Sequence, residues 1–147
     1  MLTRYSKDDR GFTLIEILVV VFILGLLAAL VAPRLVGTTD QARVTEAKVQ
    51  IRNLETALKL FKLDNGFYPT TQQGLNALIA SPTTGQEAKN FRKGGYLEKG
   101  SIPLDPWSNP YIYVSPGVNN DYEIISLGAD GREGGEEFDA DITSWNL

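Results

Sequence analysis

The chain has 147 residues, a formal net charge of −4, no cysteine and no histidine. It therefore has no disulfide framework and no thiol chemistry, and it lacks the side chain that most often serves as a general base or metal ligand. Its acidic balance is unsuited to nucleic acids, whose recognition needs basic surface. Because nucleotide-binding glycine loops, nucleophile elbows and histidine metal pairs are also missing from the sequence, we expect neither an enzyme nor a nucleic-acid-binding protein.

The chain begins with a short basic leader followed by a long apolar segment. The leader comprises residues 1–11, and Glu16 is the only charged side chain between it and Arg34. About 20 apolar residues at 1.5 Å each are enough to cross a bilayer, and basic flanks favour the cytoplasmic side. We expect residues 12–36 to form a transmembrane and assembly helix, with residues 37–147 outside the cytoplasm.

The junction between the leader and the apolar segment carries the motif Gly-Phe-Thr-Leu-Ile-Glu at residues 11–16. An ordinary secretory signal is cut after its apolar core, and the small residues at 28–32 offer such a site. The motif instead resembles the type III signal of type IV pilins and pseudopilins. This resemblance implies that residues 1–11 are a cleaved prepilin leader, removed by a prepilin peptidase after Gly11. The same enzyme would then N-methylate the new first residue, Phe12.

Glu16 is a carboxylate at the edge of an apolar segment, where an ionisable group is costly and usually functional. After cleavage, the new α-amino group of Phe12 would lie four residues from Glu16, which is the spacing of one helical face. The resemblance implies that Glu16 of one subunit neutralises the terminal amine of a neighbour during filament assembly. The alternative is that Glu16 reaches out to the lipid headgroups.

An amphipathic helical pattern follows the apolar segment. Apolar residues recur at steps of three and four, as on one face of a helix. This stripe consists of Val44, Ala47, Ile51, Leu54, Leu58 and Phe61. Asn65 and Gly66 supply a left-handed end, and Pro69 prevents continuation. The sequence predicts a helix over residues 13–64, kinked or weakened in its hydrogen bonding at Pro33.

The residues after this helix predict a compact cap on the apolar stripe. Residues 70–73 read as a capping box, ahead of a short helix that includes residues 75–79. Residues 90–105 are rich in glycine and proline and are expected to be irregular. Two alternating segments, residues 111–114 and 122–127, are expected to pair as a β-hairpin.

Four motifs of the outer segment carry a more specific resemblance. They lie at residues 63–75 (Leu-Asp-Asn-Gly-Phe-Tyr-Pro-Thr-Thr-Gln-Gln-Gly-Leu), 95–97 (Gly-Tyr-Leu), 105–111 (Asp-Pro-Trp-Ser-Asn-Pro-Tyr) and 126–131 (Ser-Leu-Gly-Ala-Asp-Gly). Together with the leader motif they resemble the major pseudopilins of bacterial type II secretion systems. The resemblance implies an α+β, pilin-like fold. In it, a long N-terminal helix with a transmembrane first half carries a small antiparallel sheet domain and a C-terminal metal-binding loop.

The same resemblance implies a function and a location. The chain would be a homopolymer subunit, single-pass in the bacterial inner membrane, with its C-terminal domain in the periplasm. Its polymer would be a periplasmic pseudopilus that helps to export folded proteins across the outer membrane. Implied partners are minor pseudopilins and the inner-membrane assembly platform. Two alternatives stay open: a type IV pilin for adhesion or motility, and an uncleaved, monomeric calcium-binding module tethered to the membrane.

An acidic, glycine-rich loop lies near the C-terminus. Its carboxylates, interleaved with three glycines, are Asp130, Glu133, Glu136, Glu137, Asp139 and Asp141. Clustered carboxylates and inward-turned carbonyls suit Ca²⁺ better than zinc or copper, although the spacing is not that of an EF-hand, and the residues alone favour a solvated acidic loop. The resemblance reverses that preference. It implies calcium ligation by Asp130, by Asp139 or Asp141, and by the carbonyls of Leu127 and Arg132.

Overall fold

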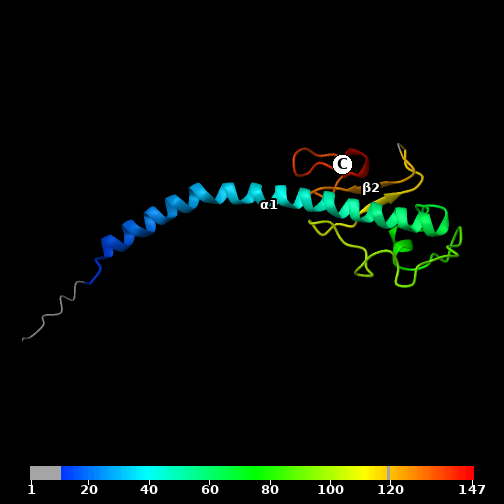
Figure 1. Ribbon diagram of the computed structural model, residues 1–147. Coiled ribbons are helices and arrows are strands. Elements are labelled where there is room, and N and C mark those ends of the chain that lie inside the picture. Colours follow the sequence, from blue (N-terminus) through cyan, green and yellow to red (C-terminus); the bar gives the residue numbers. More distant parts are fainter. Residues whose placement is uncertain (1–10, 119) are drawn as a thin grey trace, which may run out of the picture. The chain divides into compact units, whose positions relative to one another are not determined.

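The computed structural model describes residues 11–118 and 120–147, and for residues 30–38 it describes the helical backbone alone. The predicted leader therefore lies outside the described residues, except for Gly11. Within these described residues, the elements in chain order are a long α-helix, a short 3-10 helix, three β-strands and a second 3-10 helix (Figure 1). The chain divides into two compact units, which meet in the sequence between Thr39 and Asp40.

The long helix α1 spans Leu14–Asn65. It ends where Gly66 adopts a φ of 86°, a left-handed conformation that glycine tolerates without strain. The N–H of Gly66 donates to the carbonyl of Lys62 at 2.7 Å, which closes the last turn. The prediction of a helix over residues 13–64 is thus confirmed within one residue at each end, and the backbone is helical through Pro33.

The N-terminal unit contains many exposed apolar side chains. Phe12 and Leu14 are each 84% exposed, and Leu27 is still 54% exposed. Within the described part of the chain, no helical stretch combines the length and apolarity needed to cross a bilayer. The membrane-spanning segment predicted over residues 12–36 stays a prediction.

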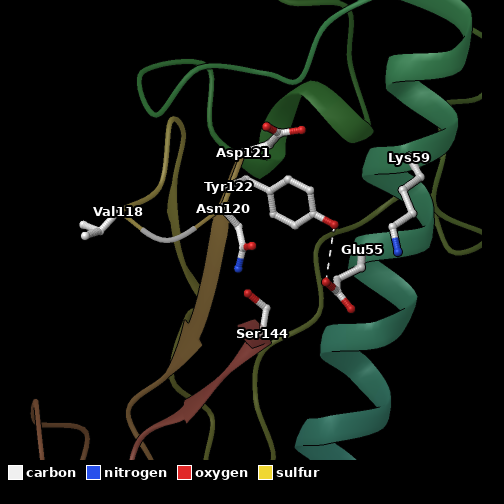
Figure 2. A pocket seen from close by; sticks show the side chains of 7 residues that line it. All are labelled: Glu55, Lys59, Val118, Asn120, Asp121, Tyr122 and Ser144. Atoms are coloured by element: carbon white, nitrogen blue, oxygen red, sulfur yellow. Dashed lines mark hydrogen bonds between the residues drawn. The ribbon is translucent and has the colours of Figure 1, made fainter. Parts of the chain in front are cut away.

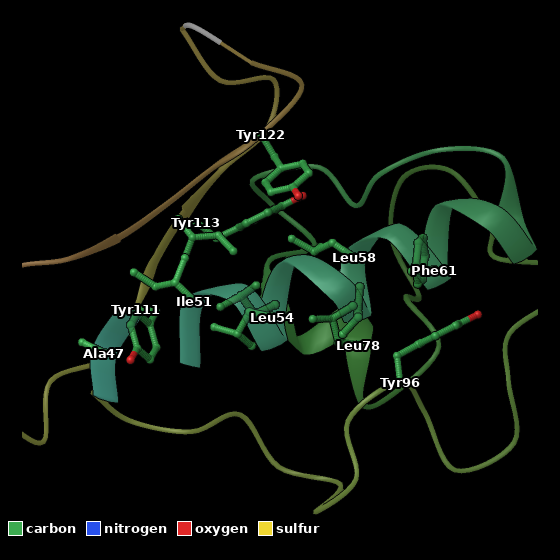
Figure 3. Close-up of a cluster of buried hydrophobic side chains, with 14 of the residues drawn as sticks. Ala47, Ile51, Leu54, Leu58, Phe61, Leu78, Tyr96, Tyr111, Tyr113 and Tyr122 are labelled. Atoms are coloured by element: carbon green, nitrogen blue, oxygen red, sulfur yellow. The ribbon is translucent and has the colours of Figure 1, made fainter. Parts of the chain in front are cut away.

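The hydrophobic core of the C-terminal unit lies along one face of α1, as the apolar stripe predicts. Ile51, Leu58 and Phe61 have no exposed surface, and the first residue of the stripe, Val44, is only partly buried. The face is covered by side chains from the later segments, among them Leu78, Tyr96, Tyr111, Tyr113 and Tyr122 (Figure 3). Each large apolar side chain buried in this way contributes about 1.5–3 kcal/mol.

The capping box predicted at residues 70–73 is present, but it closes a turn and not an α-helix. The N–H of Thr70 donates to Oε1 of Gln73 at 3.0 Å, and the N–H of Gln73 donates to Oγ1 of Thr70 at 3.3 Å. Gly74 then takes a positive φ of 60°, which interrupts helical continuation. The helix predicted over residues 75–79 is therefore the 3-10 helix η1, Leu75–Leu78. Residues 90–105 contain no helix or extended strand, as predicted.

The sheet has three antiparallel strands in the order β1-β2-β3. Strand β1, Ile112–Val114, pairs with β2, Glu123–Ser126, which confirms the predicted hairpin. Strand β3, Ile142–Thr143, pairs with the other edge of β2 and was not predicted. It is followed by the 3-10 helix η2, Ser144–Asn146. Because β2 and β3 are neighbours, the acidic loop between them starts and ends at adjacent strands.

Candidate functional site

The structure places the predicted cleavage and assembly residues at the beginning of α1. Gly11 and Phe12 precede the first helical residue, and Gly11 has open space where a side chain would lie. The peptide bond between them is therefore exposed and outside the helix, as a protease requires. In the uncut chain α1 begins at Leu14, so Phe12 lies ahead of the helix; the shared helical face expected after cleavage stays a prediction.

Glu16 forms a capping box with Thr13. Its Oε2 accepts hydrogen bonds from the backbone N–H of Thr13 at 2.8 Å and from the Thr13 hydroxyl at 2.9 Å. In return, the N–H of Glu16 donates to Oγ1 of Thr13 at 3.3 Å. This arrangement satisfies amide groups that a helix start leaves without partners and holds a negative charge near the positive end of the helix. The Glu16 side chain is thereby fixed at the helix start.

The acidic loop is folded tightly by its glycines. Gly128 has a φ of 65°, and a Cβ added there would lie 2.7 Å from the carbonyl oxygen of Asp139. A Cβ on Gly135 would also clash with that carbonyl oxygen, so the backbone of Asp139 packs against both glycines. Hydrogen bonds across the loop join the N–H of Ala129 to the carbonyl of Phe138 at 3.0 Å, and the N–H of Asp139 to the carbonyl of Glu136 at 3.0 Å. The loop is an ordered structure without regular secondary elements.

The predicted calcium ligands all lie in this loop, and they differ in burial. Oδ1 of Asp130 accepts a hydrogen bond from the N–H of Arg132 at 3.0 Å, and both residues are exposed. Oδ2 of Asp141 accepts one from the N–H of Gly134 at 3.0 Å. Its second oxygen, Oδ1, is buried and has no hydrogen-bond partner among the described residues. Asp139 is an exposed residue.

Carboxylate side chains alone do not form a metal centre here. In residues 11–118 and 120–147, no group of three or more histidine, cysteine, aspartate or glutamate side chains is arranged to hold a metal ion. A site in this loop would therefore depend on backbone carbonyls, such as those expected from Leu127 and Arg132. Carbonyl oxygens are ordinary calcium ligands.

Sequence reasoning missed a buried polar cluster beside the loop. The carboxylate of Asp105 is 4% exposed and accepts hydrogen bonds from the N–H groups of Trp107 and Asn109 and from the hydroxyl of Ser126. Ser126 is the last residue of β2, so the cluster joins the turn at residues 105–110 to the start of the acidic loop. The Asp-Pro-Trp-Ser-Asn-Pro motif carried only the family resemblance, and the hydroxyl group that bonds to its aspartate lies 21 residues away.

A groove of about 620 Å³ lies between α1 and the sheet (Figure 2). Glu55 and Lys59 line its helix side, and Tyr122 and Ser144 line its sheet side. The hydroxyl of Tyr122 donates to Oε1 of Glu55 at 3.3 Å across the groove. This bond attaches the sheet to the helix, and the groove contains none of the residues predicted as a site.

Four core tyrosines have raised pKa values, chiefly because their hydroxyl groups are desolvated, and Tyr96 is one of them. Burial, partly offset by a hydrogen bond to Ser115, raises the pKa of Tyr113 to about 12. Burial and the nearby carboxylate of Glu55 raise the pKa of Tyr122 further. Burial also raises the pKa of Tyr111, whose hydroxyl donates to Oε1 of Gln50 at 2.8 Å. These phenols are neutral in the native protein at physiological pH.

Comparisons with known proteins cover almost the whole chain. A family model described as type II secretion system (T2SS), protein G, matches residues 34–145, and a prokaryotic N-terminal methylation motif matches residues 6–32. The chain is 54% identical over 140 residues to type II secretion system core protein G of Pseudomonas aeruginosa, covering 95% of this chain and 97% of that protein. It is 50% identical over 144 residues to the protein of the same name from Vibrio cholerae, covering 98% and 97%.

A solved structure agrees with these sequence relatives. The crystal structure of the major pseudopilin from the type 2 secretion system of enterohaemorrhagic Escherichia coli superposes with a TM-score of 0.67 at 39% identity. The match covers 78% of this chain and 96% of the solved one. The expected pilin-like fold, a long N-terminal helix with a small antiparallel sheet, is thereby confirmed. The transmembrane first half and the metal-binding loop stay predictions. The chain belongs to the type II secretion system protein G family of major pseudopilins.

Proposed function

We propose that this chain is the structural subunit that polymerises into the periplasmic pseudopilus of a type II secretion system. The observation that carries the proposal is the combined match of the methylation motif over residues 6–32 and the protein G family over residues 34–145. The second match covers all but the last two residues of the C-terminal unit and thus favours this function over that of a type IV pilin for adhesion or motility. A structural subunit is not expected to be an enzyme.

The methylation motif and the family together indicate a membrane-anchored periplasmic subunit. More specifically, we propose a single pass through the bacterial inner membrane over residues 12–36, with residues 37–147 in the periplasm. A prepilin peptidase would cut after Gly11 and methylate Phe12. The exposure of both residues ahead of α1 supports this step, because a protease binds its substrate in an extended form.

In the assembled filament, the proposed role of Glu16 is to neutralise the terminal amine of a neighbouring subunit. The capping box with Thr13 supports this role, because it fixes the carboxylate at the helix start and occupies only Oε2. Among the described residues, no hydrogen bond to Oε1 is seen, so this oxygen is available to a second molecule. Pairing removes much of the cost of a charge in an apolar filament core. Minor pseudopilins and the inner-membrane assembly platform are the further partners we propose.

We also propose that the acidic loop binds one Ca²⁺. The buried, unpartnered Oδ1 of Asp141 supports it, because an isolated buried carboxylate oxygen is costly and a cation would satisfy it. Asp130 would supply a second carboxylate, and Leu127 and Arg132 would supply carbonyls. Asp139 is the weaker candidate for a side-chain ligand, since it is exposed. Bound calcium would offset the repulsion between these carboxylates and stabilise the folded loop.

The function can be tested by deleting the gene and comparing proteins in the culture medium with those in the periplasm. We expect a set of folded proteins to shift from the medium to the periplasm, and the wild-type gene to restore their export. An unchanged distribution in the deletion strain, together with a loss of surface adhesion or motility, would support the pilin alternative instead.

A further inference from the structure

The turn at residues 105–110 is held by its own buried carboxylate. Oδ1 of Asp105 accepts hydrogen bonds from the N–H of Trp107 at 3.1 Å and from the N–H of Asn109 at 2.7 Å. Oδ2 accepts a 2.7 Å hydrogen bond from the hydroxyl of Ser126. The N–H of Asp105 in turn donates to the carbonyl of Asn109 at 2.8 Å. Four hydrogen bonds therefore hold the turn and Ser126 together around the buried carboxylate of Asp105, and the backbone of Asn109 is fixed by two of them.

The side chain of Asn109 extends from this fixed turn to the beginning of the acidic loop. Its Nδ2 donates to the carbonyl oxygen of Gly128 at 3.4 Å. A Cβ built on Gly131 would lie 3.4 Å from both Nδ2 and Oδ1 of Asn109, so the amide group also lies against the backbone of Gly131. The contacts of Asn109 thus bracket Asp130 and fall between Leu127 and Arg132. Those three residues are proposed calcium ligands.

We propose that Asn109, held in place by Asp105 and Ser126, is a positioning residue for the calcium loop. It fixes the backbone of residues 127–132 before the cation binds, so that less conformational entropy is lost on binding. Substitution of a residue that orients metal ligands without touching the metal commonly weakens metal affinity by about 10- to 100-fold. The inference rests on the proposed calcium site, and it adds a residue that lies 18 positions before the first ligand in the sequence.

The test uses the full-length protein in detergent micelles and compares Asn109→Ala with Asn90→Ala. Asn90 is a matched control because its Nδ2 also donates to a backbone carbonyl, that of Asp64 at 3.1 Å, in a different part of the domain. Asn109 bonds to the Asp105 carboxylate through its backbone N–H and not through its side chain, so Asn109→Ala keeps the hydrogen bonds of the turn. Asn109→Ser serves as a milder second variant. Its side chain loses less packing than alanine would, but it is also too short to reach the carbonyl of Gly128.

Two measurements are made on each variant. Calcium affinity is measured by titration calorimetry, and we expect Asn109→Ala to bind about tenfold more weakly than the wild type, with Asn90→Ala unchanged. Amide hydrogen exchange is measured in excess chelator, and we expect faster exchange at Ala129 and Arg132 only when residue 109 is changed. Exchange without calcium reports on the loop backbone itself and does not depend on metal binding.

The outcomes separate this inference from the calcium proposal. A wild-type protein that takes up no calcium would refute the calcium site, and exchange at Ala129 and Arg132 would still decide whether Asn109 holds the loop. A wild-type protein that binds calcium, together with an Asn109→Ala variant that binds it equally well, would overturn the positioning role alone. Unchanged exchange in chelator would overturn it as well.

Discussion

The calcium proposal predicts a melting-temperature shift that depends on Asp141 and much less on Asp139. Free calcium at 100 times its dissociation constant would stabilise the folded chain by about 2.7 kcal/mol. The C-terminal unit has roughly 110 residues, and for domains of this size 1 kcal/mol shifts the midpoint by about 4 °C or more. We therefore expect the full-length protein in detergent to melt about 10 °C higher in excess calcium than in excess chelator.

The Asp141→Asn substitution should abolish most of this shift. It keeps the shape of the side chain and removes the charge from a group whose Oδ1 is buried without a partner among the described residues. In chelator the variant should melt no lower than the wild type, because a neutral amide replaces a carboxylate whose Oδ1 is buried without a partner among the described residues. The loss should therefore appear only when calcium is present.

Asp139→Asn is the matched control for this substitution. It changes the net charge of the loop by the same amount as Asp141→Asn. Asp139, however, is exposed, and it packs against Gly128 and Gly135 through its backbone and not through its carboxylate oxygens. We expect it to retain most of the calcium shift. A shift lost in Asp139→Asn and kept in Asp141→Asn would show that the ligand assignment is reversed. No shift in the wild-type protein would refute calcium binding altogether.

Three further predictions concern processing, packing and pH. Gly11→Asp should leave the precursor uncut, and N-terminal sequencing that still finds Phe12 as the first residue would refute the assigned cleavage site. Leu58→Ala, at a fully buried position, should lower the free energy of unfolding by about 2–5 kcal/mol, whereas Leu63→Ala, at a position 78% exposed, should change it by less than about 0.5 kcal/mol. Equal urea midpoints for the two variants would contradict the core assignment. Because burial raises the pKa of Tyr113 to about 12, above the ordinary value of about 10, the native state holds more protons than the unfolded state in that range. The stability that the raised Tyr113 pKa contributes is therefore complete below pH 10 and is lost as the pH rises towards 12. Constant urea midpoints between pH 9 and 12 would contradict this prediction.

Sequence patterns predicted the secondary-structure elements that are determined by residues close together in the chain. The stripe that includes Ile51, Leu58 and Phe61 has helical spacing over six positions, and the structure buries it as expected. The hairpin of β1 and β2 follows from two alternating segments separated by a turn. The capping box of Thr13 and Glu16 has the same local spacing as that of Thr70 and Gln73, although only the second was predicted.

The features that sequence analysis missed depend on contacts between distant residues. Strand β3 has two residues, too few to show alternation, and it exists because Ile142 meets the free edge of β2 opposite Ser126. The contact of Asn109 with Gly128 joins residues 19 positions apart, and neither local sequence pattern predicts it. The composition of the loop points to its carboxylates as a group, and only their burial in the structure distinguishes Asp141 from Asp139. Calcium binding by these residues stays a prediction.

The most direct test of the filament function is electron microscopy of pseudopili sheared from cells that overproduce the chain with its secretion system. We expect filaments whose subunits begin with N-methylated Phe12. Glu16→Ala should be cut at the same bond and yield no filaments, whereas Glu87→Ala, at an exposed position in the C-terminal unit, should yield normal ones. Normal filaments from Glu16→Ala would contradict the pairing of Glu16 with a neighbour. Wild-type protein that keeps Met1 and forms no filaments would contradict the pseudopilin function itself.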